Sequence, residues 1–270
     1  MLGGLGAAVL FATATLSAAR GSRLVGAESF LAGVMTVGLV IAFPLVALGR
    51  APAGLEASSF GWLALSGIGN VAGLLFDYAA LRVGRLGLVA PALISVVAGE
   101  RLAPGAAATL VLIAAGVVLA TRTGSRDGDA SDQSRRAVLL ALAAACSFGA
   151  SLYATGRVSA QLPLAWALLP ARLVGVAAVA LPLAFTGRLR LTRRAAPWVV
   201  LAGACEVGGL AAFAVGARHG IAISAVLSSQ FATLSALAGI VLFRERLARI
   251  QFAGVAAVAC GVAILSSLQS

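Results

Sequence analysis

Long apolar stretches follow one another along almost the whole chain, and they constrain its fold more than any other feature. A helix needs about 20 predominantly apolar residues to cross the hydrocarbon core of a bilayer. One run, at about 86–98, is too short, because at 1.5 Å per residue it covers only about 20 Å of a roughly 30 Å core. We therefore predict an all-α, polytopic membrane protein with ten transmembrane helices, the fourth of them short. The runs of full or nearly full length lie at about 3–19, 27–48, 59–81, 103–121, 137–156, 164–186, 195–217, 221–243 and 250–268.

The composition also favours lipid, rather than water, as the main solvent of these stretches. Hydrophobic residues make up 61% of the 270 residues and charged residues only 11%, whereas a soluble domain carries about 25% charged residues. The formal net charge is +11, and all 20 basic residues are arginine. They lie in small clusters between the apolar runs, as in the cytoplasmic loops of membrane proteins. We therefore expect the lipid bilayer, and no nucleic acid, as a partner, and a multi-pass location in the cell (inner or plasma) membrane.

The two halves of the chain repeat each other. A polar stretch at 122–136 separates them and is interpreted as a linker. We therefore divide the chain into a first five-helix repeat, 1–121, and a second five-helix repeat, 137–270. At a separation of 136 residues, Trp62 matches Trp198, Gly67 matches Gly203, Gly73 matches Gly209, Arg82 matches Arg218 and Gly84 matches Gly220, and the segment Pro44–Arg50 resembles Pro182–Arg188.

The odd number of spans in each repeat has a consequence for topology. It places the second repeat upside down relative to the first, and inverted repeats are typical of secondary transporters that bind their substrate near the bilayer midplane. Further along, the separation grows to 145 residues, where Glu100-Arg101-Leu102 matches Glu245-Arg246-Leu247. The first repeat has therefore lost nine residues inside its fourth helix, about 2.5 turns. This shortening leaves open that the protein is a degenerate, inactive copy.

A set of short motifs at the repeat spacing resembles a known family. Arg218-His-Gly-Ile-Ala-Ile-Ser-Ala-Val-Leu-Ser229 and Phe243-Arg-Glu-Arg-Leu247 resemble the EamA-type repeat of the drug/metabolite transporter superfamily, as do Gly87-Leu-Val-Ala-Pro91 and Ala98-Gly-Glu-Arg-Leu102 in the first half. The resemblance covers nearly the whole chain. It implies a ten-helix secondary transporter that moves metabolites or drugs by alternating access. The first repeat departs from the pattern, since it lacks an arginine matching Arg172 and carries the gap in its fourth helix.

Ionisable and polar residues inside the apolar runs are the candidates for function, because burying such groups in a membrane is costly. Glu206 lies at the centre of the eighth run, and its repeat partner is Asn70 at the centre of the third. Equivalent midplane positions suit a central cavity. We predict that Glu206 is a substrate ligand or a proton carrier; the alternative is a hydrogen-bonded structural glutamate.

Four further residues complete the predicted substrate-binding set. Asp77 lies near the end of the third run and either reaches the interface or pairs with a nearby arginine. Arg172 lies about two turns into the seventh run, where it either snorkels outward, pairs with Glu206 or binds an anionic substrate. Ser228 and Gln230 belong to a polar series on the ninth run, which either lines a polar path or joins helices by hydrogen bonds.

Catalysis and cofactor binding find little support in the sequence. Cys146, Cys205 and Cys260 lie in apolar runs and are interpreted as small buried residues, and His219 is the only histidine. There is no glycine-rich phosphate loop and no Gly-x-Ser-x-Gly elbow, and Gly69-x-x-x-Gly73 indicates close helix packing. We therefore expect no metal site, no cofactor and no enzyme activity.

The sequence thus favours a secondary transporter of a small organic metabolite or drug-like solute, in which the two repeats rock around a cavity at Asn70 and Glu206. Protons as the coupling ion and a homo-oligomeric state are part of this hypothesis. Two alternatives stay open: a non-transporting membrane protein that acts as an interaction partner, and a flippase for a lipid-linked substrate.

Overall fold

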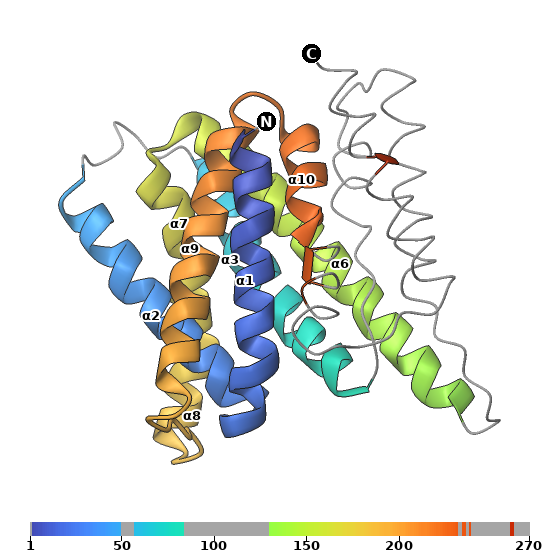
Figure 1. Ribbon diagram of the computed structural model, residues 1–270. Coiled ribbons are helices and arrows are strands. Elements are labelled where there is room, and N and C mark those ends of the chain that lie inside the picture. The colour runs from blue at the N-terminus through green and yellow to red at the C-terminus, as the bar shows by residue number, and fades with distance from the viewer. Residues whose placement is uncertain are drawn as a thin grey trace.

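The computed structural model describes residues 2–49, 57–83 and 130–231, together with the single positions 234, 235, 238, 260 and 261. Every regular element in these ranges is helical (Figure 1). The described part of the chain therefore confirms an all-helical protein. The elements are α1 (Leu2–Val25), α2 (Ala27–Ala47), α3 (Ala57–Val83), α6 (Ala130–Gln161), α7 (Leu164–Gly175), the π-helical turn η1 (Val176–Ala180), α8 (Leu181–Phe185), α9 (Ala196–Ala217) and α10 (Ile221–Ser229).

The helices follow the predicted apolar runs. Five spans within the described ranges are long and apolar enough to cross a membrane: α1, α2, most of α3, the segment formed by α7, η1 and α8, and α9. α6 covers the run at 137–156 and begins at Ala130, inside the stretch interpreted as a linker. The runs at 86–98, 103–121 and 250–268 lie outside the described residues. The total of ten helices and the short fourth helix therefore stay predictions.

One wide turn interrupts the seventh predicted helix. α7, η1 and α8 form a continuous span from Leu164 to Phe185, but Val176–Ala180 is π-helical. Pro182 follows directly, and in a regular helix a proline ring clashes with the carbonyl four residues earlier, here that of Ala178. We infer that the wider turn relieves this clash. Single π turns inside α-helices are frequent at functional sites.

Large apolar side chains cover the outside of the helical bundle, while small ones lie inside it. Phe43, Phe60 and Phe185 are 59%, 57% and 86% exposed, whereas Ala7 and Ala42 are completely buried. Small residues between helices let the backbones approach closely, which is how helices associate in a bilayer where apolar burial gives no advantage. The surface is therefore suited to lipid contact, in agreement with a multi-pass membrane protein.

The three cysteines divide between the inside and the outside of the bundle. Cys205 is buried, as expected, but Cys146 and Cys260 are exposed, so the expectation of burial is wrong for these two. Cysteine behaves as a small apolar residue, and an apolar side chain on a surface that faces lipid carries no penalty.

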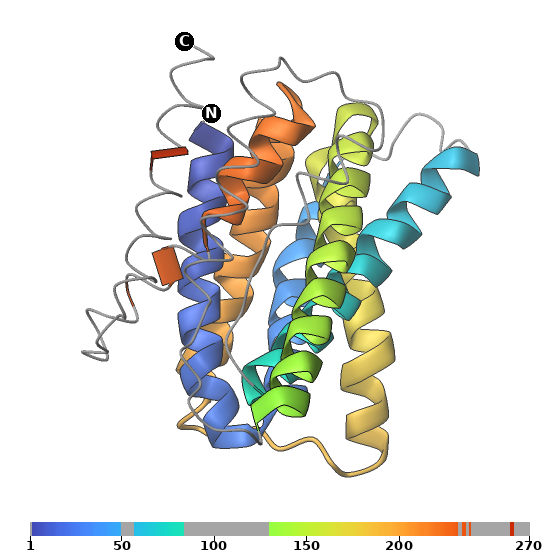
Figure 2. The same ribbon diagram turned by 90° about the vertical axis from the view of Figure 1, so that its right-hand side faces the viewer.

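The tightest helix pairs each join one helix from each half of the chain. α1 packs along α9, and α3 packs along α6. In both pairs the two helices run in opposite directions: α1 starts beside the N-terminal label and runs down in Figure 1 while α9 runs up, and in Figure 2 α3 runs down while α6 runs up. α2 and α7 contact each other and lie against α9 and α3, respectively.

Glycines permit the closest approaches between these helices. A Cβ added at Gly67 on α3 would lie 2.8 Å from the carbonyl oxygen of Pro170 on α7, and one at Gly73 would lie 2.7 Å from the ring of Phe148 on α6. At Gly69 the nearest atom would be the carbonyl oxygen of Ser147, also on α6, at 2.9 Å. The expectation that Gly69 and Gly73 mark close helix packing is therefore confirmed.

Enlarging Gly67 should destabilise the protein, because its Cβ has no room beside the backbone of Pro170. We expect Gly67→Val to lower the free energy of unfolding by about 1–3 kcal/mol through overpacking. Gly61→Val is the matched control: it lies on the same helix and carries the same loss of helix propensity, but no atom lies within 4 Å of its added Cβ. Thermal unfolding of the purified variants in detergent measures the difference, and equal melting temperatures would contradict the close contact.

Candidate functional site

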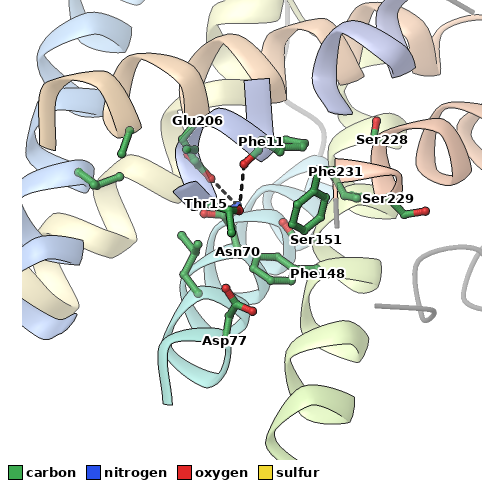
Figure 3. Close-up of a pocket in the computed structure, with 15 residues that line it drawn as sticks. Phe11, Thr15, Asn70, Asp77, Phe148, Ser151, Glu206, Ser228, Ser229 and Phe231 are labelled. Atoms are coloured by element: carbon green, nitrogen blue, oxygen red, sulfur yellow. Dashed lines mark hydrogen bonds between the residues drawn. The ribbon is translucent and has the colours of Figure 1, made fainter. Parts of the chain in front are cut away.

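A pocket lies between the α1–α9 pair and the α3–α6 pair (Figure 3). Its inner volume is about 70 Å³, enough for several water molecules. Residues from both halves of the chain line it, and the rings of Phe11, Phe148 and Phe231 form much of the apolar wall. The polar lining residues are Thr15, Asn70, Asp77, Ser151, Glu206, Ser228 and Ser229.

Glu206, in the middle of α9, is the centre of a buried polar cluster at this pocket. Its Oε1 accepts a hydrogen bond from Nδ2 of Asn70 on α3 at 3.2 Å, and its Oε2 forms an ion pair with Nη2 of Arg172 on α7. All three side chains are buried. A buried charge is tolerated only with a partner, because taking it out of water without one costs several kcal/mol. The structure thus brings together three of the six residues that the sequence predicted.

The surroundings of Arg172 explain how a guanidinium fits between helices. The side chain is completely buried, so of the alternatives for this residue the structure shows pairing with Glu206 and contradicts snorkelling to the surface. Gly38 on α2 makes room for it, since a Cβ there would lie 2.6 Å from Cδ of Arg172. Nη1 donates a weak hydrogen bond to Sδ of Met35 at 3.6 Å. Arg172 therefore stands behind Glu206 and does not itself line the pocket.

Asp77 lies in the same pocket, two turns after Asn70 on α3. Its side chain is buried, so the expectation that it reaches the membrane interface is wrong. Within the described ranges no cation pairs with its carboxylate, and its Oδ1 has no hydrogen-bond partner. The pocket therefore contains one acidic group with a fixed cationic partner, Glu206, and one without a described partner, Asp77.

The two predicted residues that follow in α10 and at its end behave differently from each other. Ser228 lines the pocket, and its hydroxyl donates a long hydrogen bond, 3.4 Å, to the carbonyl oxygen of Gly4 on α1. Gln230 is buried but does not line the pocket, because its Nε2 donates to the carbonyl oxygen of Val226 in its own helix at 3.1 Å. Ser229 lines the pocket in its place.

Sequence reasoning missed Thr15 and Ser151, which line the pocket on α1 and α6. Ser151 also donates a hydrogen bond to the carbonyl oxygen of Ser66 on α3 at 2.7 Å. Hydroxyl side chains are common in transmembrane helices, so their presence alone does not mark a site. A usable signal was the position of Ser151, three residues after Phe148 on the opening helix of the second repeat.

Removing one partner of the ion pair should destabilise the protein more than removing both. Arg172→Met leaves the carboxylate of Glu206 buried without its cation, and we expect a loss of about 3–5 kcal/mol. The double variant Arg172→Met/Glu206→Gln carries no buried charge and should recover most of that loss. A double-mutant cycle on the unfolding free energies, measured by thermal or denaturant unfolding in detergent, gives the coupling directly.

Arg157→Met controls for the loss of an arginine, because Arg157 is exposed and lies over the ring of Trp62 at 5.9 Å. Such an exposed cation–π contact contributes about 0.5–1 kcal/mol. Additive losses in the Arg172 and Glu206 variants would show that the two charges do not stabilise each other.

Comparison with known proteins supports a membrane transporter. The family described as "Sugar transport protein" matches residues 31–267, most of the chain. A solved protein crystal structure is similar over 99% of this chain and 96% of its own, with a TM-score of 0.75 and 23% sequence identity, which shows a shared fold. No curated protein matches the chain. The predicted transporter class is thereby confirmed, while the resemblance to EamA-type repeats in particular stays a prediction. The chain belongs to the sugar transport protein family, a family of membrane transporters.

Proposed function

We propose that this protein is a secondary transporter of sugars that works by alternating access, with the pocket around Asn70 and Glu206 as its substrate site. The family description supplies the class of substrate. The observation that carries the proposal is the hydrogen bond between Asn70 and Glu206, which lie 136 residues apart, the same separation that relates the two repeats. A residue and its symmetry equivalent can touch only close to the symmetry axis, and secondary transporters with inverted repeats bind their substrate there.

The other contacts between helices support the same symmetry. Gly67 lies against residue 170, and its equivalent Gly203 lies against Val34 and Val37, so the contact recurs with the halves exchanged. Ring contacts recur in the same way, since Gly73 meets Phe148 and Gly209 meets Phe11. Matching helices also run in opposite directions in Figures 1 and 2, as an inverted repeat requires.

Two cation–π contacts repeat the pattern at opposite ends of the bundle. Arg20 on α1 lies over the ring of Trp198 at the start of α9 at 5.3 Å, and Arg157 on α6 lies over the ring of Trp62 near the start of α3 at 5.9 Å. The tryptophans are repeat equivalents. Tryptophan and arginine are typical of the two membrane–water interfaces. This supports an assignment of one pair to each face of the bilayer.

The pocket has the chemistry that a sugar requires. A sugar presents several hydroxyl groups, each of which both donates and accepts hydrogen bonds, around a ring whose C–H groups are apolar. The amide of Asn70 and the carboxylate of Glu206 supply donors and acceptors, while the faces of Phe11 and Phe148 can cover the C–H groups. Arg172 holds Glu206 in position from behind and acts as a positioning residue.

The packing also suggests which bodies move. Ser66 and Thr155 share a hydrogen bond of 2.6 Å between α3 and α6, and the glycine contacts at Gly69 and Gly73 tighten the same pair. α1 and α9 form the other closely packed pair. The pocket lies between these two pairs. We therefore replace rocking of the two sequence halves by movement of the α1–α9 unit against the α3–α6 unit, with the polar cluster as the pivot.

Loss of Asn70 should abolish sugar transport. We expect purified protein in proteoliposomes to exchange at least one of radiolabelled glucose, ribose or galactose, and Asn70→Ala to slow that exchange at least about tenfold, as loss of a buried polar ligand does. Thr13→Ala is the control, because the Thr13 hydroxyl donates only to the carbonyl oxygen of Val9 in its own helix at 2.9 Å. Exchange of a labelled amino acid or amphiphilic cation, with none of the three sugars exchanged, would contradict the substrate class.

The inverted repeat predicts opposite sidedness for two equivalent turns. The turn after α1 and the turn after α6 lie at opposite ends of the bundle (Figure 2). In a variant whose three cysteines are replaced by serine, cysteine at Arg23 or at Gln161 should therefore react with an impermeant maleimide from opposite sides of the membrane. Labelling of permeabilised cells controls for reactivity. Labelling of both positions from the same side would refute the inverted arrangement.

A further inference from the structure

One acidic side chain of the pocket is buried without a described partner. Asp77 is 6% exposed and lines the pocket together with Asn70, on the same face of α3 (Figure 3). Its Oδ1 has no hydrogen-bond partner in the part of the chain that the structure describes. Glu206, by contrast, has Asn70 on one oxygen and Arg172 on the other. The two carboxyl groups of the pocket are therefore in different situations, and only one of them is already neutralised by a fixed positive charge.

The repeat equivalent of Asp77 shows what this position holds when packing alone decides. Phe213 lies 136 residues later, is completely buried and belongs to an apolar cluster with Leu210 and Val207. A carboxyl group at a position that is otherwise part of an apolar core is costly unless a ligand neutralises it. Asp77 therefore needs a partner that is not a fixed part of the described protein.

No described charge on the helices around α3 is free to be that partner. Glu28 on α2 and Cys146 on α6 are exposed, Tyr153 and Arg157 on α6 both lie against the ring of Trp62, and Arg172 on α7 is paired with Glu206. Among the described residues that line the pocket, Glu206 is the only other titratable group. The neutralising species must therefore come from the pocket itself.

We propose that Asp77 is the proton-binding site that couples sugar movement to a proton gradient. Oδ1 or Oδ2 of the carboxylate binds a proton from pocket water when the pocket opens to the acidic side, and the same O–H bond breaks when it opens to the other side. A proton needs no further ligand. A hard metal cation needs several oxygen ligands, and the described residues hold no group of three or more acidic, histidine or cysteine side chains. The inference rests on the proposed function for its sugar substrate.

The first experiment needs no substrate. Infrared difference spectra of the protein in lipid, recorded between high and low pH, should show the carbonyl band of one buried carboxylic acid. We expect Asp77→Asn to lose this band and Glu206→Gln to retain it. If Asp77→Asn does not yield a folded protein, Asp77→Glu replaces it and should shift the band rather than remove it. A band that persists unchanged in the Asp77 variant would overturn the proposal.

The second experiment tests coupling in proteoliposomes. With the acidic side outside, wild-type protein should accumulate the sugar that it exchanges, whereas a sodium gradient of equal size should not drive accumulation. In Asp77→Asn the ratio of gradient-driven accumulation to sugar exchange should fall at least about tenfold, because a neutral side chain cannot carry the proton. Glu28→Gln, an exposed acidic residue outside the pocket, is the matched control and should behave as wild type.

The outcomes separate the two proposals. Loss of the infrared band in Asp77→Asn, together with no exchange of any sugar by the wild type, would leave the proton site standing and refute the sugar substrate. Sugar exchange by the wild type with an unchanged accumulation ratio in Asp77→Asn, or accumulation driven by sodium alone, would refute the role of Asp77 and leave the transporter standing.

Discussion

The ion pair between Arg172 and Glu206 is the interaction on which the arrangement of the helices depends. Apolar packing alone does not fix how transmembrane helices are rotated, because lipid satisfies an apolar face as well as a neighbouring helix does. A buried guanidinium and carboxylate do fix it, since either charge without the other is costly. Gly38 on α2 provides the space, and Asn70 on α3 adds the hydrogen bond. One charge pair thereby holds four helices in register at the middle of the bundle.

Around this cluster the helices combine rigidity with a polar opening. The hydroxyls of Ser66 and Thr155 and the glycines of α3 hold α3 and α6 together, and α1 and α9 pack along each other in the same manner. Between the two pairs the contacts give way to the pocket. This division places the flexible boundary where the polar groups are, so that a bound solute touches both bodies at once.

The sequence predicted the helices well because each spans an apolar run, and it predicted the meeting of Asn70 with Glu206 because the repeat made them equivalent. It left the partner of Arg172 open, since one helix does not reveal how its neighbour is rotated. For the same reason it missed Ser151 and included Gln230, whose side chain bonds to its own helix. The burial of Asp77 also depended on neighbouring helices and could not be derived from its place near the end of a run.

The wide turn at Val176–Ala180 explains a small mismatch between the halves. Arg20 and Arg157, which make equivalent ring contacts, are 137 residues apart, whereas Pro44 and Pro182 are 138 apart. The second half has therefore gained one residue between these points, and a π turn holds more residues than an α turn. Growth absorbed in a single bulge leaves the upstream charge and the downstream membrane exit undisturbed, so evolution can adjust the length of one crossing without rebuilding the chamber beside it.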